Sequence, residues 1–99
     1  MVEAKLKPIH PGEVLVEEFL KPFGLDEHEL AVRTKIDAAR LKGIVERTKP
    51  VGADEALRLG KYFGVSPQFW LGLQSDYDLD VAKDRLGDVL EKEIVPIAA

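Results

Sequence analysis

Basic side chains that could bind the phosphates of a nucleic acid gather between residues 33 and 49. They are Arg33, Lys35, Arg40, Lys42, Arg47 and Lys49. Only Asp37 and Glu46 oppose them, so this stretch carries +4, whereas the whole chain of 99 residues carries −4. A local basic patch can attract phosphates in an acidic protein, because salt screens charges that lie beyond about 10 Å. The plainer alternative is a charged face that is merely solvated.

Two short helices joined by a turn are expected to present this patch. Asp26 stands where an N-cap belongs, and Glu29 follows it three residues later, as in a capping box. Asp37 is the next N-cap candidate. The helix behind it has buried positions at helical spacing, namely Leu41, Ile44 and Val45. Residues 27–46 therefore have the layout of a helix-turn-helix, whose second helix lies in the major groove of DNA.

The residues that would contact DNA follow from their places in this motif. At the exposed front of the second helix, Ala38 and Ala39 offer only methyl contacts, for example to thymine. The basic side chains could pair with guanine or with phosphates. The predicted set is Ala38, Ala39, Arg40, Lys42, Arg47 and Lys49, with Lys35 as a weaker candidate. Two alanines at reading positions predict modest discrimination per half-site, so dimerisation and DNA shape would supply much of the specificity.

The rest of the chain also reads as helical. Pro11 opens one helix, which ends at Lys21-Pro22 and Gly24. Another begins near residue 53, and Ser66-Pro67 begins a short fifth helix. The expected inner face of the fourth helix is Ala53, Ala56, Leu57, Gly60 and Phe63, and the fifth would bury Phe69, Trp70 and Leu73. Because no sustained period-two alternation occurs, we predict an all-α fold.

A further helix is predicted after residue 75. Its apolar positions, spaced by three and four, are Leu79, Ala82, Leu86, Val89 or Leu90, and Ile94. Gly87 within it would weaken it by about 1 kcal/mol relative to alanine. This helix either folds back on its own domain or pairs with a second copy. We therefore expect a helix-turn-helix domain at 1–75 and an acidic C-terminal helix and tail at 76–99.

Catalytic and metal-binding chemistry finds little support. The chain has no cysteine. His28-Glu29 starts like a zinc-protease motif, but Val32 stands where the second histidine would be needed. No glycine-rich phosphate loop or supported catalytic triad occurs, so we expect no enzyme, no cofactor and no metal. No apolar run approaches the roughly 18 residues of a membrane span, and a secretory signal is lacking, which favours a cytoplasmic protein.

The chain resembles a known family. The resemblance is carried by "HPGEVLVEEFLKPFGL" and "ADEALRLGKYFGVSPQFWLGLQSDYDL", together with the helix-turn-helix between them. They are similar to the HigA/VapI group of antitoxins, within the XRE-type, lambda-repressor-like DNA-binding proteins. The resemblance runs from about residue 10 to about residue 82. It implies a bundle of about five short helices, here with an additional C-terminal helix, and a homodimer.

The resemblance also implies two activities. Such antitoxins neutralise a co-encoded toxin, usually a small ribonuclease that cleaves messenger RNA, and they repress their own operon by binding its double-stranded operator DNA. Two alternatives stay open: a stand-alone regulator of the same fold without a toxin, and a protein-interaction module that has lost DNA binding.

Three pairs depart from the family pattern. Asp26-Glu27 replaces the usual Ser-Gln, which puts an acid at a place that faces phosphate and should weaken DNA binding. Thr34-Lys35 replaces Leu-Gly at the turn, and Glu46-Arg47 replaces Asn-Gly after the second helix. Glycine at the turn supplies a positive φ, so Lys35 either costs about 1 kcal/mol or belongs to a different turn.

Overall fold

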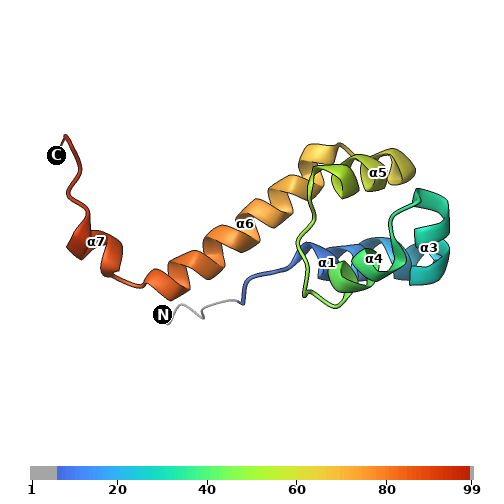
Figure 1. The fold of residues 1–99 in the computed structure, drawn as a ribbon, viewed down its shortest axis with the longest axis horizontal. Coiled ribbons are helices and arrows are strands. Elements are labelled where there is room, and N and C mark those ends of the chain that lie inside the picture. Colours follow the sequence, from blue (N-terminus) through green and yellow to red (C-terminus); the bar gives the residue numbers. More distant parts are fainter. Residues whose placement is uncertain (1–6, 99) are drawn as a thin grey trace.

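A computed structural model describes residues 7–98, and every regular element within them is helical. The order along the chain is α1 (Pro11–Val14), η1 (Leu15–Leu20), α2 (Lys21–Phe23), α3 (Glu27–Thr34), α4 (Ala38–Val45), α5 (Ala53–Phe63), α6 (Pro67–Leu86) and α7 (Val89–Glu93). In Figure 1 the elements from α1 to α5 form one bundle, from which α6 extends toward α7. The predicted all-α fold is confirmed.

The first helical stretch is continuous from α1 through α2 but contains a π-helical turn, η1. Its start is capped by His10, whose Nδ1 accepts a hydrogen bond of 2.9 Å from the backbone N–H of Gly12. Near its end, the N–H of Lys21 donates to the carbonyl of Val16, five residues back. Pro22 has no N–H to continue the ordinary ladder, so a wider turn just before it accommodates the proline.

The core lies where the helices of the bundle meet. α5 packs against α6, α3 against α4, and α1 against both α4 and α6. Its largest fully buried side chains are Trp70, Leu15, Leu30, Leu41, Ile44, Leu59 and Pro11. Aromatic rings extend the core toward the surface, with the ring centroids of Phe19 and Trp70 5.0 Å apart. The predicted burial of Leu41 and Ile44 in α4 is therefore confirmed.

The inner face of α5 differs from the prediction. Leu57, expected inside, is 60% exposed, and Ala53 is exposed as well. The buried face contains Leu59, which the prediction omitted, together with Ala56 and Gly60. Successive helical residues are rotated by about 100°, which turns Leu57 away from the side that these three residues share. Phe69, expected in the core, is also 38% exposed.

The two helices predicted after Ser66 are a single helix of 20 residues, α6. No proline or cap interrupts it near residue 75, and the buried Gln74 lies within it. The helix ends at Gly87, which has a φ of +56°. The expected boundary between a helix-turn-helix domain at 1–75 and a C-terminal helix and tail at 76–99 falls inside this helix. The boundary therefore remains a proposal that the two parts have different roles.

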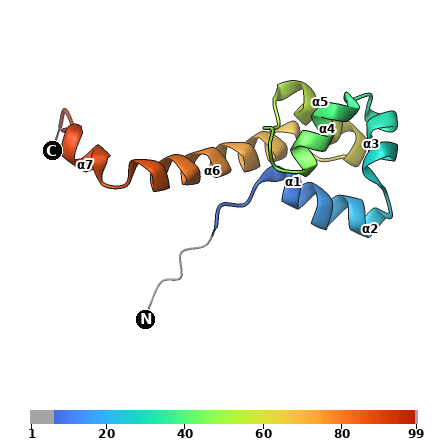
Figure 2. The same ribbon diagram turned by 60° about the horizontal axis from the view of Figure 1, so that its bottom comes forward.

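The outer part of α6 and α7, residues 79–93, project from the bundle; we call them the C-terminal arm. Both views show the arm pointing away from the other helices (Figures 1 and 2). The molecule measures 51 Å along its longest axis, and its radius of gyration is 16.6 Å. A compact domain of this length would have about 13 Å. The arm thus leaves apolar side chains in water, among them Leu79 and Leu90.

Among residues 7–98, two non-glycine residues have a positive φ, and both lie where the family pattern has glycine. Lys35, at the end of α3, has φ +62°, and Arg47, after α4, has φ +65°. The turn of the helix-turn-helix is therefore retained, and Lys35 adopts the left-handed conformation in spite of its Cβ. Such a conformation costs an L-residue about 1–2 kcal/mol.

We expect Lys35→Gly to raise the free energy of unfolding by about 1 kcal/mol, because glycine adopts this φ without strain. Urea titration followed by the fluorescence of the single tryptophan, Trp70, measures it. The matched control is Lys42→Gly, in the middle of α4, which should lower the free energy of unfolding by about 1 kcal/mol. Equal destabilisation by both changes would show that Lys35 is not strained.

Candidate nucleic-acid interface

The turn between α3 and α4 is held by short-range hydrogen bonds. The Thr34 hydroxyl donates to the carbonyl of Leu30 at 2.7 Å and accepts the N–H of Ile36 at 3.3 Å. Ile36 is buried and anchors the turn to the core. Both predicted N-caps are confirmed, since Asp26 accepts from the Glu29 N–H at 2.7 Å and Asp37 from the Arg40 N–H at 3.1 Å.

The front of α4 presents the predicted reading positions to solvent. Ala38, Ala39 and Lys42 are all exposed. The side chain of Lys42 is 63% exposed and pairs with Glu46 at 3.3 Å, one turn further along the helix. An exposed pair of this kind is weak enough to open when a phosphate competes for the ammonium group. The outer face of α4 is thus available to a DNA groove, and the contacts of these residues with DNA remain predictions.

The loop that follows α4 folds back across the end of the helix. The backbone N–H groups of Thr48 and Lys49 both donate to the carbonyl of Gly43, at 2.8 and 3.1 Å. The aliphatic stem of Lys49 lies directly over Gly43, where a Cβ would come within 2.6 Å of it. A glycine at this position therefore allows the loop to close against α4. Arg47 and Lys49 are exposed in this loop, beside the reading face.

Arg40, which was predicted to contact DNA, is bound within the protein. Its Nε donates to Glu55 Oε2 at 2.6 Å, and its Nη2 contacts Glu55 Oε1 and the carbonyl of Pro50 at 3.3 and 3.2 Å. Glu55 also accepts the N–H of Gly52 at 2.8 Å. We call this arrangement the Arg40–Glu55 pair. It joins α4, the following loop and α5, so Arg40 positions the reading face.

Burial disfavours the charged form of the Glu55 carboxyl group, but hydrogen bonds from Arg40 and from the N–H of Gly52 outweigh it and lower its pKa. The hydrogen bonds to Glu55 and the charge of that carboxylate raise the pKa of Arg40. The pair therefore remains ionised at neutral pH. It stabilises the fold above the ordinary pKa of a glutamate, and this contribution is lost as the pH falls through the lowered value.

A second connection runs from the loop to α1 and α6. His10 is buried, and its ring contacts that of Tyr77 edge-on, with the centroids 4.9 Å apart. Burial lowers the pKa of His10, against an opposing hydrogen bond with the backbone of Lys49. The neutral ring therefore accepts at Nδ1 from Gly12 and holds the loop at its other side. His10 is therefore a capping residue of α1.

Two positioning residues were missed by sequence reasoning. Glu55 lies 15 residues from its partner Arg40, and Gln74 accepts the N–H of Val51 from 23 residues away, at 2.8 Å. No local sequence pattern indicates a polar pair between residues so far apart in the chain. An acid in the first turn of a helix is favourable through the helix dipole alone, so the position of Glu55 does not by itself indicate a distant partner.

Other kinds of site have little basis in the part of the chain that the structure describes. Among residues 7–98, no three His, Cys, Asp or Glu side chains are grouped so that they could hold a metal ion. Every helix in the same range is too short or too polar to span a lipid bilayer. The exposed face of α4 and its loop are therefore the candidate site that the sequence and the structure support together.

Proteins of known sequence or structure are similar to this chain over most of its length. No protein-family model matches the chain. Virulence-associated protein I of Dichelobacter nodosus is 46% identical over 79 residues, which are 80% of this chain and 73% of that protein. The antitoxin HigA of Pseudomonas aeruginosa, solved with the higBA promoter, has a TM-score of 0.87 and 44% identity over 91% of this chain and 98% of its own. A P. aeruginosa protein solved with an 18-base-pair operator has a TM-score of 0.91 and 43% identity, over 96% and 100%.

The Arg40–Glu55 pair yields a stability prediction. Arg40→Ala should lower the free energy of unfolding by about 1–2 kcal/mol, because it leaves the Glu55 carboxylate without its main partner, although water reaches part of the site. Urea titration measures this loss. Arg33→Ala is the control, since Arg33 belongs to an exposed pair with Glu29 and should cost less than about 0.5 kcal/mol. If both variants are equally stable, Arg40 does not position α4.

Proposed function

Because this chain belongs to the HigA/VapI family of helix-turn-helix proteins, we propose that it is the DNA-binding antitoxin of a toxin–antitoxin module and represses its own operon. The observation that carries the proposal is the exposed face of α4 beside a basic loop, in a fold that relatives use in complexes named for promoter or operator DNA.

On DNA, α4 would lie in the major groove with Ala38 and Ala39 against base edges. Lys42 would reach a base or a phosphate from the same face, and the loop residues Arg47 and Lys49 would contact the phosphate backbone. Lys35, in the turn, remains a weaker candidate for such a contact. Arg40 is the least available of the predicted contacts, since two of its nitrogens are engaged with Glu55 and Pro50.

The partner protein in this proposal is a small ribonuclease toxin that cleaves messenger RNA and is encoded in the same operon. A gene for such a toxin next to the gene of this protein distinguishes an antitoxin from the alternative, a stand-alone regulator with the same DNA-binding face. We infer no enzymatic activity for this chain, whose relatives include proteins named as antitoxins and as transcriptional regulators. Since its operator DNA and its toxin would both be in the bacterial cytoplasm, we place the protein there.

A homodimer would present two copies of α4 to successive half-sites of the operator. The C-terminal arm is suited to join the copies. Leu79, Ala82 and Leu86 recur at helical spacing along it, and Leu79 is 58% exposed. A helical segment of this length is marginal in water when it buries no apolar face. A second arm packed against these residues would bury that face and extend a self-complementary interface.

DNA binding is tested with the purified protein on its own upstream DNA and on a scrambled duplex, at two salt concentrations, by fluorescence anisotropy. We expect preferential binding that weakens steeply with salt. Lys42→Ala and Arg47→Ala should each lower the affinity, and each lost phosphate contact should reduce the salt slope by about one.

Lys83→Ala, an exposed lysine of α6 outside the helix-turn-helix, is the matched control and should leave both quantities unchanged. Equal binding to the two duplexes would favour the third possibility, a module that has lost DNA binding.

Self-association is tested by light scattering coupled to gel filtration. We expect a dimer, and we expect Leu79→Asp combined with Leu86→Asp to give a monomer with weakened operator binding, because two charges cannot be buried in an apolar interface. Val81→Asp, on another side of the same arm, should remain dimeric. A dimer that survives the double change would place the interface elsewhere.

A further inference from the structure

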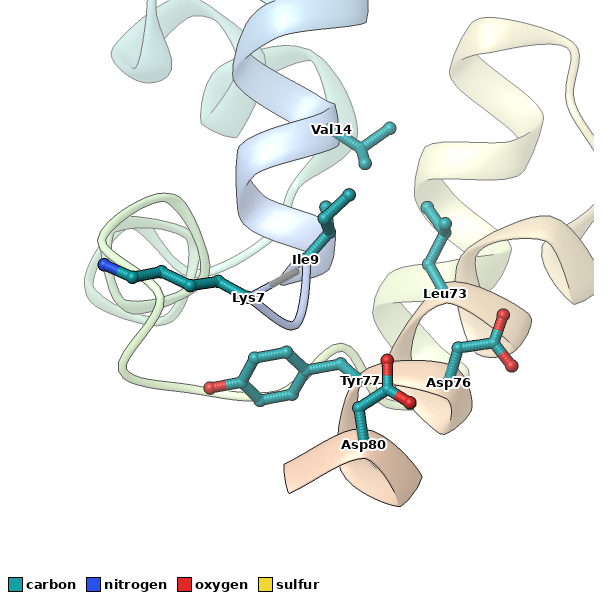
Figure 3. A pocket seen from close by; sticks show the side chains of 7 residues that line it. All are labelled: Lys7, Ile9, Val14, Leu73, Asp76, Tyr77 and Asp80. Atoms are coloured by element: carbon teal, nitrogen blue, oxygen red, sulfur yellow. The ribbon is translucent and has the colours of Figure 1, made fainter. Parts of the chain in front are cut away.

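We propose that a groove between the N-terminal segment and α6 is the docking site for a basic segment of the toxin, an inference that rests on the function proposed above. The groove is lined by Lys7, Ile9, Val14, Leu73, Asp76, Tyr77 and Asp80 and has a volume of about 320 Å³. Figure 3 shows Ile9 and Val14 on one wall, opposite Leu73 on α6.

The floor of the groove is apolar and accessible. Val14 and Leu73 are half-buried, and Ile9 is 54% exposed although it lies directly before the buried His10. An exposed isoleucine that opens into a groove offers more binding energy than one on a convex surface, because a partner side chain can be surrounded by apolar atoms there. One or two apolar side chains of a partner would fit between these three residues.

The rim of the groove is acidic. Asp76 and Asp80 lie one turn apart on α6, and both are exposed and line the groove. In Figure 3 the carboxylate of Asp80 turns toward the groove beside Tyr77, whereas that of Asp76 lies at the outer edge and points away from Ile9 and Val14. Neither has an ion-pair partner among residues 7–98. These two carboxylates would repel the phosphates of DNA, and the basic loop residues line a different pocket, on the side of Tyr77 that contains His10. The two carboxylates outnumber the single basic residue of the lining, Lys7, so the charge of the groove favours a cationic occupant.

A toxin that cleaves messenger RNA has the required chemistry. RNA is a polyanion, so a protein that binds it needs a surface rich in lysine and arginine. Acidic groups that face such a surface raise the rate of association and fix the orientation of the complex. The apolar floor then contributes affinity that charge alone does not supply.

The groove is distinct from the face of the arm that we assign to the second copy. At about 100° per residue, Leu73, Tyr77 and Asp80 lie about 100–180° around α6 from Leu79 and Leu86. Asp76 lies about 60° from Leu79, at the edge between the two faces. DNA, a second copy and the toxin would thus occupy three separate faces, and the three complexes can be tested separately.

The experiment measures the affinity between this protein and the purified product of the neighbouring toxin gene by titration calorimetry. The first variant reverses two charges, Asp76→Lys with Asp80→Lys, and the second is Ile9→Glu. The control is Glu18→Lys with Glu93→Lys, which changes the net charge equally at two exposed acids outside the groove. We expect each groove variant to lose at least tenfold in affinity for the toxin, with operator binding not weakened and dimer mass unchanged, and the control to lose less than threefold.

Each other outcome has a definite meaning. If the wild-type protein does not bind the toxin, the proposed antitoxin function fails, and this inference fails with it. If the wild-type protein binds and both groove variants bind equally well, the groove is wrong while the function stands. If the control loses as much as the groove variants, only net charge matters, and the groove is not the site. If the groove variants become monomers, the groove is a contact between copies.

Discussion

The Arg40–Glu55 pair is the interaction on which the geometry of the proposed DNA-binding surface depends. It connects the second helix of the motif to α5 and, through the carbonyl of Pro50 and the N–H of Gly52, to the last part of the intervening loop. A guanidinium group suits this task because it donates to several acceptors in fixed directions, which an ammonium group does not do. The interaction fixes where the basic loop lies relative to α4.

The loop is fixed from its other side as well. Gln74 holds Val51, and the neutral ring of His10 holds the backbone near Lys49, so elements from both ends of the chain meet at this loop. Position 43 must be glycine for the aliphatic stem of Lys49 to pass over α4, because a Cβ there would clash with it. We expect a basic surface with these supports to change little on binding DNA, which would reduce the entropic cost of association.

The net negative charge of the chain is compatible with a DNA-binding role because the basic and acidic side chains lie on different parts of the surface. The basic residues surround α4, while Asp76 and Asp80 lie on α6 beside an apolar groove. The long helix α6 makes this separation possible, since its inner part packs on α5 and its outer part projects away from the bundle (Figure 1). One element thereby contributes to the core, to the proposed toxin groove and to the proposed dimer interface.

The sequence by itself determined the helical class, the helix-turn-helix, its two N-caps and the burial of Leu41 and Ile44. These features follow from caps and periodicity, which act within a few residues. It also identified Lys35 as a residue in a glycine position. The tertiary structure alone decided that Arg40 binds Glu55, that Leu57 faces solvent and that α6 is one continuous helix. Each of these depends on which distant segment lies against a given side chain, and local spacing carries no information about that choice.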